Sequence, residues 1–194
     1  YEGTNEINRM LSVGMLIKKA MKGHVDLLGP ASKVQEELMG IPSFDTPDYS
    51  ELFAEEKEMI TKLKKAFLMV AGGAVQKYGP DLDAHQQLLM AASDILIEIY
   101  MAESTILRTE KLAKTNGADK IKEQIAMAQL YLYQAVDIVT QKGKESIISF
   151  AEGDEQRMML MGLRRYTKYT NMPNVVGLRE TITSKLVTEN AYCF

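Results

Sequence analysis

The sequence has little cysteine, proline or phenylalanine and no tryptophan. Its 194 residues include one Cys, five Pro and five Phe. A single cysteine cannot form an internal disulfide, which excludes a small scaffold held together by disulfides. The few prolines, together with only 13 glycines, exclude collagen-like and proline-rich chains. The longest near-continuous apolar run covers only residues 67–75, whereas a transmembrane helix needs about 20 residues.

The sequence also has no large excess of positive or negative side chains. The chain has 23 Lys and Arg against 26 Asp and Glu, for a net charge of -3. This balance argues against a non-specific nucleic-acid binder. Hydrophobic residues make up 46% and charged residues 25%, which is typical of a globular domain and excludes disorder as the dominant state. Residues 1–12 lack the apolar core of a secretory signal peptide, so we expect a cytoplasmic or mitochondrial-matrix protein.

What the sequence does have is helical periodicity. Unbranched apolar residues are frequent, with 13 Met, and they suit helices. Apolar positions recur every three or four residues, and no convincing β-alternation interrupts them. The fold class that we predict is all-α, an antiparallel bundle of three long helices with shorter C-terminal helices covering it. The predicted helices are 4–21, 31–39, 50–78, 82–115, 118–142, 154–169 and one that starts at Pro173.

The helix over 82–115 carries the widest apolar surface. Its stripe consists of Leu88, Ala92, Ile95, Ile99, Ala102 and Ile106, and we expect Leu89, Leu96, Tyr100 and Leu107 to widen it. A helix with such a wide stripe is expected at the centre of the bundle. Two glycine features stay open. Gly72 and Gly73 indicate either close helix packing or a kink, and Gly143 either ends its helix or only weakens it.

Prolines mark the domain boundary. Three of the five fall within 24–49, the least regular stretch of the chain. We therefore divide the chain into 1–23, 24–49 and 50–194. The first part is one helix, the second is a linker with a short helix, and the third is a helical bundle domain.

Common catalytic and metal-binding patterns are missing. His24 and His85 are the only histidines, and neither lies in a ligand cluster, so we predict no metal site. The sequence contains neither a G-x-S-x-G nucleophile elbow nor a phosphate-binding G-x-x-x-x-G-K loop. Glu98, Glu103 and Glu110 lack the Glu-x-x-His motif of di-iron bundles.

The first residues are the most informative. Residues 1–11, YEGTNEINRML, closely resemble the signature Y-E-G-T-N-E-I-Q-R-L of acyl-CoA dehydrogenases. Asn8 stands where that pattern has Gln, and Met10 where it has Leu. The order of residues is specific enough that we identify the chain as similar to this family. Residues 67–113 also resemble, in pattern, the extra C-terminal helical domain of the very-long-chain group. The resemblance thus implies the C-terminal part of a flavin-dependent dehydrogenase.

The resemblance implies roles for five residues. In the medium-chain and very-long-chain types the glutamate matching Glu2 is the catalytic base. Tyr1, Glu2 and Gly3 would border the acyl-CoA substrate, while Thr4 and Glu6 would contact the FAD cofactor. Thr4 and Glu6 also fit a helix N-cap and a first-turn charge, and both interpretations hold together. The family implies a homodimer, with a fatty acyl-CoA as substrate and an electron-transfer flavoprotein as electron acceptor. Without upstream flavin domains, we expect the isolated chain to be inactive and free of FAD.

Two alternatives remain at this stage. An acyl-CoA oxidase shares the same base chemistry. A non-catalytic helical module, used for dimer, partner or peripheral membrane contact, is the other. The second rests on residues 154–170, where a Met-rich cluster lies near basic side chains. We expect this helix to pack in the core instead, with Met159 and Met161 buried.

Overall fold

The fold is a bundle of α-helices. The structure, a computed structural model, describes residues 3–40 and 48–194, and in these residues it contains helices and no strand, as predicted. Within that described part, no helix combines the length and apolar character needed to cross a membrane. The helices are α1 (Asn5–Met21), α2 (Leu28–Met39), α3 (Ala54–Tyr78), α4 (Gln86–Asn116), α5 (Lys122–Phe150), α6 (Gly153–Tyr166) and α7 (Val175–Glu189), with short 3-10 helices η1 (Gly79–Ala84) and η2 (Ala118–Ile121).

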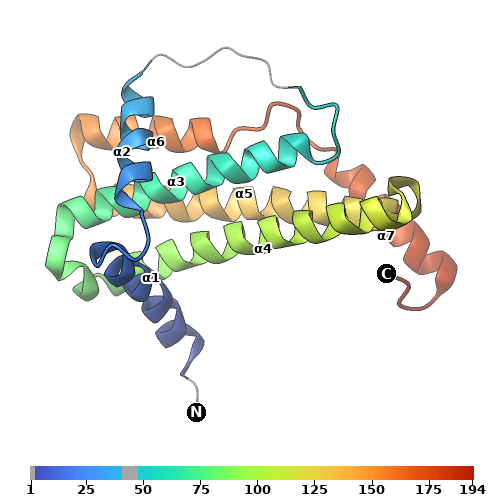
Figure 1. Cartoon of the computed structure of the whole chain (residues 1–194), viewed down its shortest axis with the longest axis horizontal. Coiled ribbons are helices and arrows are strands. Elements are labelled where there is room, and N and C mark those ends of the chain that lie inside the picture. Colours follow the sequence, from blue (N-terminus) through green and yellow to red (C-terminus); the bar gives the residue numbers. More distant parts are fainter. Residues whose placement is uncertain (1–2, 41–47) are drawn as a thin grey trace.

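Three long helices form the centre. In Figure 1, α3, α4 and α5 lie side by side and alternate in direction, which confirms the antiparallel arrangement. The predicted stripe of α4, from Leu88 to Ile106, is buried against its neighbours. Shorter helices cover this centre: α6 packs on α3 and α5, α7 on α5, and α1 on α4. The shared core includes Leu63, Ile95, Ile106, Leu132 and Ile147, each at most 1% exposed.

Several helix boundaries differ from prediction. The third helix begins at Ala54 rather than residue 50, because Phe53 takes a left-handed conformation (φ 64°) and buries its ring. Pro30 lies inside the first turn of α2, where its missing N–H costs no helical hydrogen bond. The break at Gly79 is a 3-10 turn that delays α4 to Gln86. At the C-terminal end, α6 stops at Tyr166 and α7 starts at Val175.

The glycines inside helices mark close contacts. A Cβ on Gly73 would meet the Cε of Met159 at 2.8 Å and the ring of Phe150 at 2.9 Å. Close packing therefore accounts for this glycine. Helix α5 runs through Gly143 to Phe150, so Gly143 does not end it. A Cβ at Gly143 would come within 2.8 Å of the Leu163 side chain on α6, which explains a small residue at that point.

The predicted widening of the α4 stripe is wrong at two positions. Leu89 is buried and Leu96 packs against the core, but Tyr100 is 66% and Leu107 52% exposed. Each follows a residue of the buried stripe by one position, so both side chains lie about 100° around α4 from that stripe. Periodicity gave the helix correctly, whereas the width of the buried face depends on which neighbours are present.

Helix α6 packs in the core through one side only. Met159 is 4% exposed and Leu163 3%, which confirms the core expectation for this helix. Met161 is 73% exposed, so its predicted burial is wrong. Two residues correspond to about 200° around a helix, which turns Met161 away from the side that Met159 occupies. Arg165 lies over α2, with its guanidinium Nη2 3.6 Å from the Glu37 carboxylate.

Candidate functional site

The N-terminal motif forms the start of α1. Gly3 has a positive φ of 91°, a conformation that favours glycine. Thr4 then caps the helix, because its hydroxyl oxygen accepts a hydrogen bond from the Ile7 backbone N–H at 3.4 Å. The motif therefore has a structural role at the helix N-terminus, as the sequence predicted.

Of the ionisable residues Tyr1, Glu2 and Glu6, the structure describes only Glu6. Tyr1 and Glu2 lie outside the described residues, so the assignment of Glu2 as base stays a prediction. Glu6 is exposed in the first turn of α1. Hydrogen bonds from its own backbone N–H and from the Thr4 hydroxyl lower the pKa of its carboxyl group. Glu6 is thus ionised at neutral pH, which suits a hydrogen-bond acceptor and not a general acid.

Two polar contacts fix the direction of α1. The Nε atom of Arg9 lies 2.8 Å from the Oδ1 atom of Asp94 on α4. One turn further, the hydroxyls of Ser12 and Ser93 are 2.8 Å apart. Val13 is 1% exposed beneath them. The first turns of α1 extend beyond the bundle, so the motif lies at a projecting end (Figure 1).

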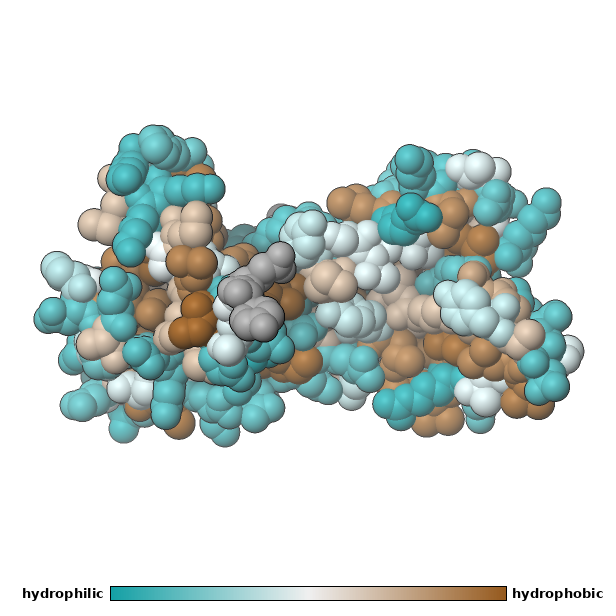
Figure 2. Space-filling view, turned by 90° about the horizontal axis from the view of Figure 1, so that it is seen from below, coloured by the Kyte–Doolittle hydropathy of each residue, from teal (hydrophilic) through white to brown (hydrophobic). Residues whose placement is uncertain are grey.

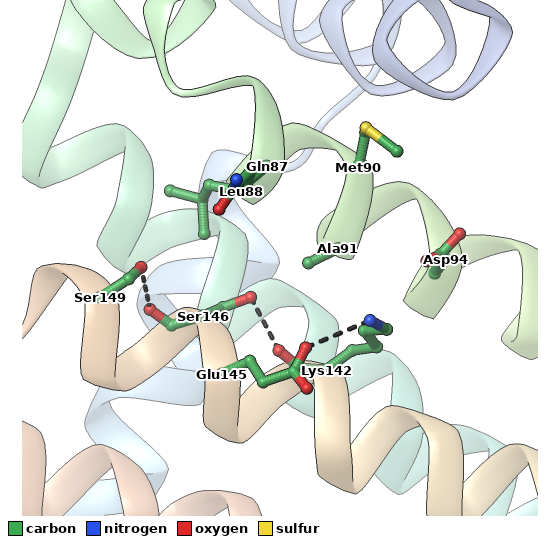
Figure 3. A pocket seen from close by; sticks show the side chains of 9 residues that line it. All are labelled: Gln87, Leu88, Met90, Ala91, Asp94, Lys142, Glu145, Ser146 and Ser149. Carbon is green, nitrogen blue, oxygen red and sulfur yellow. Dashed lines mark hydrogen bonds and ion pairs between the residues drawn. The ribbon is translucent and has the colours of Figure 1, made fainter. Parts of the chain in front are cut away.

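A hollow of about 300 Å³ lies between the start of α4 and the end of α5. Figure 3 shows that its α5 side chains bond within their own helix. The Ser146 hydroxyl donates to the Lys142 carbonyl at 2.8 Å, and the Ser149 hydroxyl donates to the Ser146 carbonyl at 2.6 Å. Lys142 pairs with Glu145 at 3.1 Å. These polar groups already have partners, so the hollow offers no obvious catalytic group.

A second, apolar hollow of about 400 Å³ lies between α1, α2, α3 and α6. Val13, Ala31 and Phe67 are among its lining residues. Neither hollow is lined by Gly3, Thr4 or Glu6. The described part of the motif is therefore exposed. Within the described chain it has none of the enclosing walls that exclude water from a catalytic centre.

The two histidines lie apart from any cluster of possible ligands in the described chain. His85 stacks on Tyr78, with ring centroids 3.6 Å apart, and His24 is exposed. In residues 3–40 and 48–194, no group of three metal-ligating side chains comes together.

The glutamates of α4 contact side chains of neighbouring helices. Glu103 pairs with Lys64 at 2.6 Å and Glu110 with Lys57 at 2.8 Å, both on α3. The adjacent Lys57 and Lys114 hold the pKa of the Glu110 carboxyl below its usual value. On the opposite side, the hydroxyl of Tyr131 donates to Glu98 at 2.9 Å. These contacts account for the three carboxylates without a metal.

These features define a class: an all-α helical domain that carries the Gly-Thr-Asn-Glu part of the motif at the start of a projecting helix. The model of the family described as "Acyl-CoA dehydrogenase, C-terminal domain" matches residues 62–165. The chain belongs to this acyl-CoA dehydrogenase family. A probable acyl-CoA dehydrogenase of Bacillus subtilis (strain 168) is 39% identical over 170 residues, which cover 88% of this chain and 28% of that protein.

A solved structure is similar over the whole chain. The crystal structure of an acyl-CoA dehydrogenase from Bacillus anthracis, complexed with FAD, shares 39% sequence identity and gives a TM-score of 0.90. The similarity covers 100% of this chain and 32% of that one. The chain thus spans less than a third of the length of either relative.

Sequence reasoning missed the residues that orient the motif. Arg9 and Asp94 are 85 positions apart, and Ser12 and Ser93 are 81 apart. One signal was present in the sequence, since Arg9 belongs to the family signature. Its partner on α4 had no local signal, because a charged residue on a helix surface is common.

Proposed function

We propose that this chain is the C-terminal part of an FAD-dependent acyl-CoA dehydrogenase that introduces an α,β double bond into a fatty acyl-CoA. One observation carries the proposal. A segment that matches the family model, residues 62–165, follows the YEGTNEI sequence on the same chain. The relative that is similar over the entire chain is an acyl-CoA dehydrogenase complexed with FAD.

In this proposal the chain contributes one edge of the active site. FAD, when bound, accepts the hydride that leaves the β-carbon of the substrate. The Glu2 carboxylate removes the proton from the α-carbon, which requires burial that raises its pKa towards working pH. The backbone N–H of Glu2 donates a hydrogen bond to the thioester oxygen, where negative charge develops. Tyr1 borders the acyl group, and Gly3 allows close approach of the backbone.

The residues present fit one edge of a flavin site. The hydroxyl of Thr4 and the carboxylate of Glu6 are exposed at the projecting end of α1, and hydrogen bonds to flavin hydroxyls suit both groups. The remaining walls must come from chain outside these 194 residues. We therefore expect the isolated chain to be inactive and colourless.

The domain division follows from the same proposal. Residues 1–23 would be the last helix of the catalytic domain, 24–49 a linker and 50–194 the helical domain. Helices α3, α4 and α5 pack on one another in the third part, and α1 and α2 pack on them across the proposed boundaries. In the whole enzyme we expect a homodimer that passes electrons to an electron-transfer flavoprotein.

The test is Glu2→Gln in the full-length protein, which keeps the shape and removes the base. Acyl-CoA dehydrogenation should fall by at least about 10²-fold, the lower end for a positioned acid or base, while FAD stays bound. Glu152→Gln is the matched control. This exposed residue precedes α6, so its loss should leave the rate unchanged. A drop of less than about tenfold for Glu2→Gln would place the base elsewhere.

A further inference from the structure

An apolar stripe lies on the outer side of α1. Ile7, Leu11 and Met15 follow one another at every fourth residue and are 52%, 54% and 47% exposed. They point away from the side of α1 that holds Arg9 and Val13 against the bundle. The stripe extends over about 12 Å of helix. Helix α1 therefore has two apolar sides, of which the bundle covers one.

A second apolar stripe continues the surface on α4. Ile97, Tyr100, Met101 and Leu107 are between 43% and 66% exposed. Helical spacing places Ile97, Tyr100 and Leu107 within about 40° of Ser93 around the helix. Ser93 is the α4 residue whose hydroxyl lies 2.8 Å from that of Ser12 on α1. Helix α1 thus covers the first part of this outer side and leaves the next turns uncovered by the described chain.

The two stripes together form the α1–α4 surface, defined by Ile7, Leu11, Met15, Ile97, Tyr100, Met101 and Leu107. Figure 2 views the molecule from the side on which the N-terminus projects, and brown residues lie next to the grey N-terminal atoms and further along the bundle. Positions 97, 100, 101, 104 and 107 of α4 are uncharged, and the exposed, charged Arg108 lies beside them on this side. Charge depletion and large apolar side chains are typical of the buried centre of an interface.

We infer that the α1–α4 surface is the docking face for the polypeptide that precedes Tyr1 in the full-length protein. The inference rests on the proposed function, which requires such a preceding part. It is supported by the relatives' length, because this chain spans 28% and 32% of them. The similarity to the FAD-bound relative also includes α1, since it covers 100% of this chain.

The covalent connection favours this occupant over a second copy. The preceding polypeptide would be attached at the projecting end of α1, next to the surface. Tethering makes its association intramolecular and gives it a high effective concentration. Once docked on both stripes, it would hold the start of α1, and hence Gly3 and Thr4, against the rest of the site.

Hydroxyl-radical footprinting of the unmodified full-length protein tests the inference, because Met and Tyr side chains react according to their exposure. Met15 and Met101 should be oxidised at least about tenfold more slowly in the native than in the urea-unfolded protein. A tenfold difference corresponds to about 1.4 kcal/mol of protection. Tyr100 should be protected likewise. Met161 and Met172, 73% and 70% exposed, are matched controls and should react at nearly their unfolded rates.

Three results would overturn the inference. The first is oxidation of Met101 and Tyr100 as fast as that of Met161. The second is protection that disappears on dilution to monomer, which assigns the surface to a second copy. The third is protection that appears only with anionic lipid vesicles, which assigns it to a membrane. Failure of the proposed function is distinguishable, because loss of the Glu2 effect changes activity and leaves this protection pattern unaltered.

Discussion

Replacing Gly73 by alanine sets helix propensity against packing. Gly73 and its neighbour Gly72 occupy adjacent positions in the interior of α3. Alanine in a helix interior is favoured over glycine by about 0.8–1.0 kcal/mol. Helix propensity alone would therefore favour both substitutions equally.

The contacts separate the two positions. A Cβ at Gly72 has its nearest neighbour, the Cβ of Ala31, at 3.8 Å, which is an ordinary contact. A Cβ at Gly73 meets Met159 at 2.8 Å and the Phe150 ring at 2.9 Å. The methionine end can move, but the ring of Phe150 is 4% exposed and confined by the core. Overpacking of this kind costs about 1–3 kcal/mol.

The expected changes in stability therefore differ between the two positions. Gly72→Ala should stabilise by up to about 1 kcal/mol, whereas Gly73→Ala should be neutral or destabilise by up to about 2 kcal/mol, the balance of propensity and overpacking. Thermal and urea unfolding of the 194-residue chain measure the difference, with about 2–4 °C in Tm for each kcal/mol at this length. Equal stabilisation by both substitutions would show that Phe150 and Met159 yield without cost, and would refute the reasoning.

Two further predictions concern buried side chains. Met159→Ala should lower the free energy of unfolding by about 2–5 kcal/mol, as expected for a buried methionine. Met161→Ala should change it by no more than about 0.5 kcal/mol, as at an exposed site. Equal losses of stability in urea unfolding would contradict the assigned faces of α6. Burial raises the pKa of Tyr166 from 10.0 to about 12. The stability from its neutral hydroxyl is fully present below pH 10 and is lost as the pH rises towards 12. Between pH 10 and 12 the Tyr166→Phe variant should therefore lose less stability than the unsubstituted protein. Urea midpoints that fall in parallel for both proteins would exclude the effect.

Local sequence determined the helices. Stripes such as Met59 to Ala74 on α3 and Leu88 to Ile106 on α4 are buried where their periodicity places them, because the 3.6-residue turn fixes which side chains share a face. The cap at Thr4 was also predictable, since capping depends only on the next three residues. The signature at residues 1–11 gave the family, which the match to residues 62–165 confirms. The role of Glu2 stays a prediction from that resemblance.

Tertiary structure decided which faces are covered and what the glycines do. Tyr100 and Leu107 continue an apolar pattern, yet they are exposed because α1 covers only earlier turns of that side of α4. The direction of α1 depends on Arg9 and Asp94, which lie 85 positions apart. Gly73 differs from Gly72 only through side chains of α5 and α6. Each of these outcomes depends on contacts between residues distant in the chain, whereas periodicity carries information about one helix at a time.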